Sequence, residues 1–62
     1  MTYLERIRAH PAVDSVSVEP GDYGTCYFVY LKTGWEWSEQ TSFGCETVTE
    51  AWSLVRQAKQ VR

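Results

Sequence analysis

Long hydrophobic runs are missing from this sequence. The longest apolar run, from Cys26 to Leu31, spans six residues, whereas a membrane-spanning helix needs about 20. The N-terminal residues also lack the basic and then apolar pattern of a secretory signal. We therefore expect a cytoplasmic protein that has no membrane partner.

Histidine and cysteine are scarce, which limits the chemistry available to the chain. His10 is the single histidine, and Cys26 and Cys45 are the two cysteines. Structural zinc sites usually contain closely spaced ligand pairs such as C-x2-C, and no such pair is present. The glycines lack the spacing of a phosphate-binding loop. We predict no catalytic, metal-binding or cofactor-binding residue and no small-molecule ligand, and we expect both thiols to be reduced.

Basic residues are nearly absent from the middle of the chain. Residues 13–50 contain seven acidic residues and one cation, Lys32, so their net charge is −6, whereas Arg56, Lys59 and Arg62 follow without an acid. The sequence therefore predicts a charge dipole with an acidic middle and a basic end. The formal net charge of −2 makes nucleic acid an unfavourable partner, because that binding draws on phosphate neutralisation by cations.

Large aromatic side chains are abundant for so short a chain. The 62 residues are 15% aromatic and include three tryptophans. A chain of this length holds one core, and it needs efficient apolar side chains to do so. We predict a single small globular domain over residues 1–62.

The residue pattern predicts the order helix, three strands, helix. Apolar residues at helical spacing indicate a short helix over residues 3–9 and a long one over residues 48–61. Alternating apolar and polar residues, or a high content of aromatic and β-branched residues, indicate strands over residues 13–18, 25–31 and 35–39. The expected fold is α+β, an αβββα chain with a three-stranded antiparallel meander and two helices packed mainly on one face. Phe43 and Cys45 could extend the sheet, but the sequence leaves that boundary open.

Local signals support these elements. Thr2 with Glu5, and Thr47 with Glu50, form capping boxes at the two helix starts. Gly34 is suited to a left-handed turn residue between the second and third strands. We expect His10 to be a surface residue at the corner before Pro11. The predicted core consists of Leu4, Ile7, Trp52 and Val55 together with one face of the second strand.

The second strand is apolar on both of its faces. Cys26, Phe28 and Tyr30 alternate with Tyr27, Val29 and Leu31. Such a run is typical of a central strand, and helices packed on one sheet face would leave the other face partly open. An exposed apolar patch often marks an interface. The alternative is that the aromatic rings lie flat in solvent or that residues 40–46 cover them. The predicted interface residues are Tyr27, Phe28, Tyr30, Trp35 and Trp37.

These patterns favour a small non-catalytic protein-interaction module that binds a protein partner or forms a homodimer through its sheet face. Its size and acidic middle also fit a bacterial or phage regulator that mimics nucleic-acid charge, as anti-CRISPR proteins often do. The alternative function is nucleic-acid binding through Arg56, Lys59 and Arg62.

The order helix, three strands, helix resembles that of the double-stranded RNA-binding domain. In that family a basic cluster at the start of the last helix binds phosphates. Here Glu46 and Glu50 occupy the corresponding stretch, and the cations lie at the other end of the predicted helix. The resemblance therefore implies a topology and no RNA-binding site.

Overall fold

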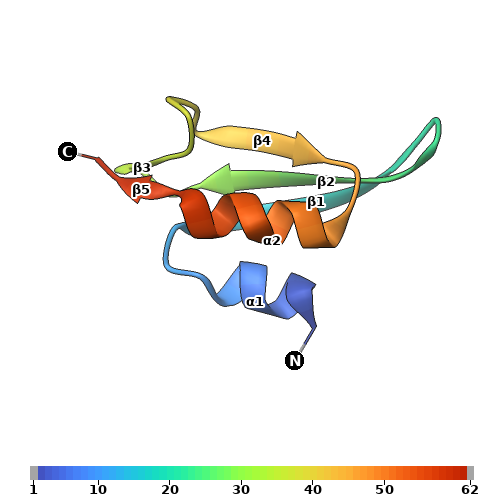
Figure 1. Cartoon of the computed structure of the whole chain (residues 1–62), viewed down its shortest axis with the longest axis horizontal. Helices are drawn as coiled ribbons and strands as arrows, with labels where there is room; N and C mark the ends of the chain where they lie inside the picture. The colour runs from blue at the N-terminus through green and yellow to red at the C-terminus, as the bar shows by residue number, and fades with distance from the viewer. Residues whose placement is uncertain (1, 62) are drawn as a thin grey trace.

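The computed structural model describes residues 2–61, which form two helices and two antiparallel sheets (Figure 1). The larger sheet has the strand order β1-β2-β4, and β3 pairs with β5 in a separate small sheet. The elements are α1 Tyr3–Ala9, β1 Val13–Gly21, β2 Gly24–Leu31, β3 Trp35–Glu36, β4 Ser42–Cys45, α2 Val48–Gln57 and β5 Lys59–Gln60. The α+β class and the meander-like sheet of three strands are as predicted.

The predicted capping box begins α1. The Thr2 hydroxyl accepts a hydrogen bond from the backbone N–H of Glu5 at 3.2 Å, and the Glu5 carboxylate accepts one from the backbone N–H of Thr2 at 3.2 Å. The carboxylate also accepts a hydrogen bond from the Thr2 hydroxyl at 3.0 Å. The bonds from the Thr2 backbone N–H and hydroxyl favour the ionised carboxylate, so they lower the pKa of Glu5. The helix ends at His10, whose backbone is extended, because Pro11 disfavours helical angles in the residue before it.

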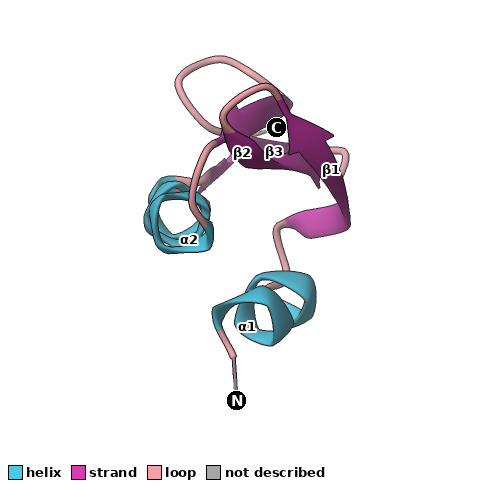
Figure 2. Cartoon of the chain, turned by 90° about the vertical axis from the view of Figure 1, so that its right-hand side faces the viewer, coloured by secondary structure: helices cyan, strands magenta, loops and turns pink. Residues whose placement is uncertain are grey.

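β2 is the central strand, and both helices lie on one side of its sheet (Figure 2). The strand pairs antiparallel with β1 on one edge and β4 on the other. On the helix side, Ile7 of α1, Val29 of β2 and Val55 of α2 are fully buried. Leu4 and Trp52, which the sequence also predicted in the core, are only half-buried at its rim.

The third strand was predicted wrongly. Only Trp35 and Glu36 of the expected segment are strand residues, and they pair with β5 instead of β2. The chain then reverses at Ser38 and Glu39, which have positive φ values of 50° and 65°, and Trp37 and Gln40 exchange backbone hydrogen bonds of 2.9 Å across this turn. Alternating aromatic and polar residues gave no sign of the reversal, because such turns normally use glycine or asparagine.

The end of α2 was also predicted wrongly. The helix stops at Gln57, and Ala58 is extended, with φ −60° and ψ 142°. Residues 59–60 then form β5, and the backbone N–H of Val61 donates to the carbonyl of Gly34. Tertiary backbone pairing thus overrides the helical spacing of the last apolar residues. Gly34 has a φ of +92°, which confirms its predicted left-handed conformation.

His10 is not a surface corner residue. Its side chain is half-buried, and its ring lies edge-on to Trp35 and Trp52 at centroid distances of 6.2 and 6.1 Å. Its Nδ1 accepts a hydrogen bond from the backbone N–H of Ala12 at 3.1 Å. The imidazole therefore joins the first helix–strand corner to α2 and the small sheet.

The turn at Ser38 and Glu39 gives a test of backbone strain. Left-handed angles cost non-glycine residues about 1–2 kcal/mol each, and glycine removes that cost at the expense of a more flexible unfolded chain. We expect Glu39→Gly to raise the free energy of unfolding by about 1 kcal/mol, measured by urea denaturation. Gln40→Gly is the matched control in the same turn, and equal gains from both variants would contradict this explanation.

Candidate protein-interaction face

The side of the large sheet opposite the helices carries a mixed apolar and small-residue surface, which we call the open face. Cross-strand partners point to the same side of a sheet, so the register defines its members. Phe28 lies between Ser17 and Gly44, and Tyr30 lies between Ser15 and Ser42. The open face comprises Ser15, Ser17, Glu19, Cys26, Phe28, Tyr30, Ser42 and Gly44.

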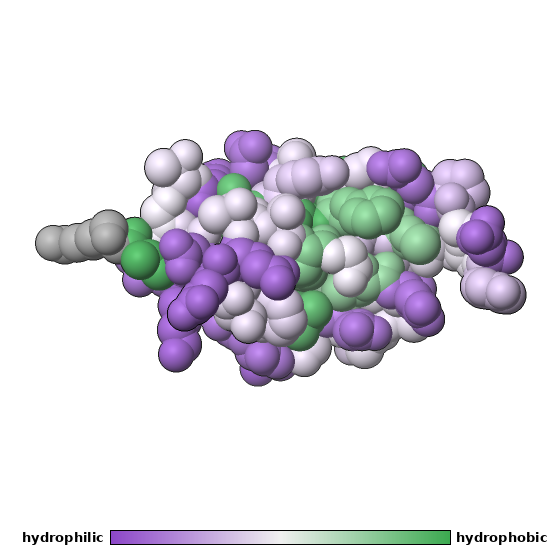
Figure 3. Space-filling model, turned by 90° about the horizontal axis from the view of Figure 1, so that it is seen from above, coloured by the Kyte–Doolittle hydropathy of each residue, from purple (hydrophilic) through white to green (hydrophobic). Residues whose placement is uncertain are grey.

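Phe28 occupies the centre of the open face. Its ring lies over Gly44, where an added Cβ would come within 3.0 Å of a ring carbon. The absent side chain at Gly44 therefore lets the ring lie close to β4, and Ser17 on the other flank is also small. Phe28 is therefore half-buried, and part of its ring stays in contact with solvent. Figure 3 shows the result, an apolar patch over the middle of this face bordered by hydrophilic residues.

Tyr30 and Cys26 extend the apolar surface along β2 in opposite directions from Phe28. Tyr30 is 44% exposed. Cys26 is half-buried because its sulfur lies against Gly21, where an added Cβ would approach it to 2.8 Å. Among residues 2–61, both helices lie on the other side of the sheet (Figure 2).

Carboxylates surround the hairpin end of the open face. Glu19 is the cross-strand partner of Cys26 and accepts a hydrogen bond from the Ser17 hydroxyl at 2.9 Å. A hollow of about 190 Å³ beside Cys26 is lined partly by Asp22 and Glu46. The three acids are exposed, so this end of the face is negative, and it lies next to the fully exposed Tyr23 at the hairpin tip.

The five predicted interface residues do not share one surface. Phe28 and Tyr30 lie on the open face, but Tyr27 has the opposite orientation and is half-buried on the helix side. Trp35 and Trp37 are half-buried against the core, and the Trp37 ring lies 5.4 Å from that of Phe43. Periodicity already placed Cys26 on the same strand face as Phe28, but only the strand register identifies Gly44 and Ser17 as neighbours of Phe28.

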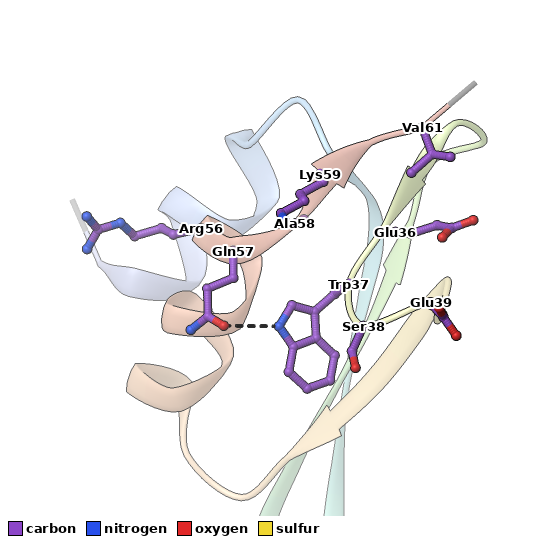
Figure 4. Close-up of a pocket in the computed structure, with 9 residues that line it drawn as sticks. All are labelled: Glu36, Trp37, Ser38, Glu39, Arg56, Gln57, Ala58, Lys59 and Val61. Carbon is purple, nitrogen blue, oxygen red and sulfur yellow. Dashed lines mark hydrogen bonds between the residues drawn. The ribbon is translucent and has the colours of Figure 1, made fainter.

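Trp37 also forms the wall of a groove between α2 and the small sheet. The groove has a volume of about 760 Å³, and the Trp37 indole Nε1 donates to the Gln57 Oε1 at 3.3 Å across it. Figure 4 shows that the carboxylates of Glu36 and Glu39 point away from Arg56, so the charged groups do not converge. The groove therefore offers no defined set of ligand-binding groups.

The predicted nucleic-acid residues do not form a basic helix face. Arg56 belongs to α2 and Lys59 to β5, and the groove that both residues line also contains Glu36 and Glu39. Arg62 lies outside the described residues. Arg56 and Lys59 therefore line the same groove as two acids, Glu36 and Glu39.

The two cysteines lie on opposite sides of the sheet. Cys26 is on the open face, and Cys45 pairs with Tyr27 on the helix side and is only 5% exposed. Both are free thiols. Burial raises the pKa of Cys45, and the nearby negative charge of Glu50 raises it further.

Comparisons with known proteins add no constraint. No protein-family model matches the sequence, and no curated protein or solved structure is significantly similar to it. Residues 2–61 contain no group of three or more histidine, cysteine, aspartate or glutamate side chains that could hold a metal ion. The described helices are too short and polar to cross a membrane.

The opposite orientations of the thiols predict selective alkylation. At neutral pH, iodoacetamide should modify Cys26 at least about tenfold faster than Cys45, because reaction needs an accessible thiolate. Mass spectrometry of digests taken over time measures both rates, and the urea-unfolded chain, in which the rates should converge, is the control. Equal rates in the folded protein would contradict the assigned faces.

Proposed function

We propose that this domain is a small non-catalytic module that binds protein through its open face. The observation that carries the proposal is the pair Phe28, half-buried at the centre of a sheet face, and Tyr30, 44% exposed beside it. No helix lies over this face among the described residues (Figure 2). Apolar groups gathered in the middle of a face and bordered by polar ones are the usual composition of an interface.

The side chains of the open face suit this role. Phe28 and Tyr30 bury large areas with few rotatable bonds, so they lose little conformational entropy on binding. Ser17 and Gly44 beside Phe28 are small, which allows a flat or extended partner to approach the ring closely. The Tyr30 side chain is 44% exposed, so its hydroxyl can form a polar contact with a partner.

The size of the open face limits the strength of binding. Eight residues of β2 span about 26 Å, and three strands are about 14 Å wide, which gives roughly 400 Å². A standard stable interface buries about 800 Å² on each partner. The face alone therefore supports transient binding, and a stable complex, including a homodimer, needs additional contacts from the hairpin or the rim.

Two further parts of the proposal depend on composition. Both cysteines are free thiols, as is usual in reducing compartments, which supports a role in the cytoplasm. The acidic carboxylates at the hairpin end are compatible with a bacterial or phage regulator that mimics nucleic acid, and that origin stays a prediction. Binding of nucleic acid through Arg56 and Lys59 is disfavoured by the acids beside them.

Substitution of the aromatic residues on the open face tests the proposal. A random peptide library displayed on phage is selected on the immobilised domain, and the selected clones are then assayed on Phe28→Ser and Tyr30→Ser. Sedimentation equilibrium of each protein shows in parallel whether it dimerises. We expect either peptide clones that bind the domain or a homodimer of it. Each of the two substitutions should weaken that binding by at least about tenfold, since central aromatic anchors often contribute 2 kcal/mol or more.

Tyr3→Ser is the matched control, because it removes an exposed aromatic ring of α1, which lies on the side of the sheet away from the open face (Figure 2). It should leave binding unchanged, and thermal melts verify that each variant folds. A monomer whose selected clones bind the Phe28→Ser and Tyr30→Ser variants as well as the unaltered domain would refute the proposed function.

A further inference from the structure

On the basis of the binding role proposed above, we propose that the open face binds an extended, basic segment of another protein. Arginine or lysine side chains of that segment lie at the hairpin end, near Glu19, Asp22 and Glu46, and apolar side chains lie on Phe28 and Tyr30. Three features of the open face support this assignment: its charge, the change in that charge from one end of β2 to the other, and its area.

The charge of the open face selects a cationic partner. Its eight members include Glu19 and no lysine or arginine, and Asp22 and Glu46 line the adjoining hollow. Opposite charges across an interface steer association and exclude partners of the same sign. The same charge disfavours a second copy, because two open faces pressed together provide no counter-charge for these carboxylates.

The charge also has a direction along β2. Carboxylates gather near Cys26 at the start of the strand, whereas Lys32, the only cation of residues 13–50, follows directly after its end. Alternate residues of an extended chain are about 6.6 Å apart, which matches the spacing of Cys26, Phe28 and Tyr30 along β2. An extended segment therefore aligns cationic side chains with the hollow and apolar ones with the two aromatic rings.

The hollow beside Cys26 gives the cation a defined place. Its volume of about 190 Å³ is large enough for the end of a lysine or arginine side chain, and Glu46 lines it together with the hairpin residues. The Ser17 hydroxyl, which donates to Glu19 Oε2 at 2.9 Å, holds the third carboxylate on the same face. The area of roughly 400 Å² suits an extended segment better than a whole globular surface.

Designed peptides test this inference directly. The probe is a capped eight-residue peptide with arginine at its first and third positions, leucine at the fifth, phenylalanine at the seventh and serine elsewhere. A second peptide replaces both arginines with glutamine. Fluorescence anisotropy gives the affinity of each peptide, and the rate of Cys26 alkylation shows whether the bound peptide covers the hollow. We expect the arginine peptide to bind about tenfold more tightly and to slow alkylation, because each exposed ion pair contributes up to about fivefold.

Two charge-neutralising variants of the domain locate the effect. The double variant Glu19→Gln, Glu46→Gln should weaken binding of the arginine peptide about tenfold and reduce its salt dependence. The double variant Glu36→Gln, Glu39→Gln removes the same charge on the groove side and should leave affinity within about twofold. Equal losses from the two double variants would show attraction to the net charge alone and would overturn the inference.

The remaining outcomes separate this inference from the proposed function. Equal affinity of the two peptides, with binding lost in Phe28→Ser, would refute the basic partner and leave the open face as a binding surface. Failure of the arginine peptide to bind would overturn the inference as well. In both cases the library selection still decides the proposed function, because it imposes no charge on the peptides.

Discussion

The structure depends on β2 being the central strand of a sheet that has only two helices to cover it. β1 and β4 satisfy its backbone on both edges, while Ile7 and Val55 from the helices pack on the side of Val29. Both helices lie on that one side (Figure 2). Among residues 2–61, no helix therefore covers the other face of this strand, although its residues are apolar on both faces.

The aromatic residues divide into two groups because of this arrangement. Trp35, Trp37 and Trp52 lie at the edges of the core on the helix side, where they add buried area that so small a domain needs. Phe28 and Tyr30 lie on the other face of the sheet, where their side chains do not contribute to packing against the helices. The charges divide in a similar way, since acids gather at the hairpin end of the open face while Arg56 and Lys59 lie near the end of α2.

The sequence predicted the features that arise from local patterns. Capping residues fixed the start of α1, and the apolar composition of β2 indicated a central strand. Prediction from the sequence failed where backbone pairing between residues far apart in the chain decides the structure. The second helix ends early because residues 59–60 pair with β3, and the chain reverses at two non-glycine residues with positive φ. The same limit applies to the open face: periodicity separated Phe28 from Tyr27, but only the register placed Gly44 beside Phe28.

The central claim is that Phe28 and Tyr30 face water while the other side of β2 is enclosed. Solvent paramagnetic relaxation in NMR measures this most directly, because a soluble paramagnetic agent broadens only protons that it can approach. In dilute solution the ring protons of Phe28 and Tyr30 should be relaxed less strongly than those of the fully exposed Tyr23 but clearly more strongly than the methyl protons of Val29, which should be protected. Protection of the Phe28 ring equal to that of Val29 at every protein concentration would contradict the account.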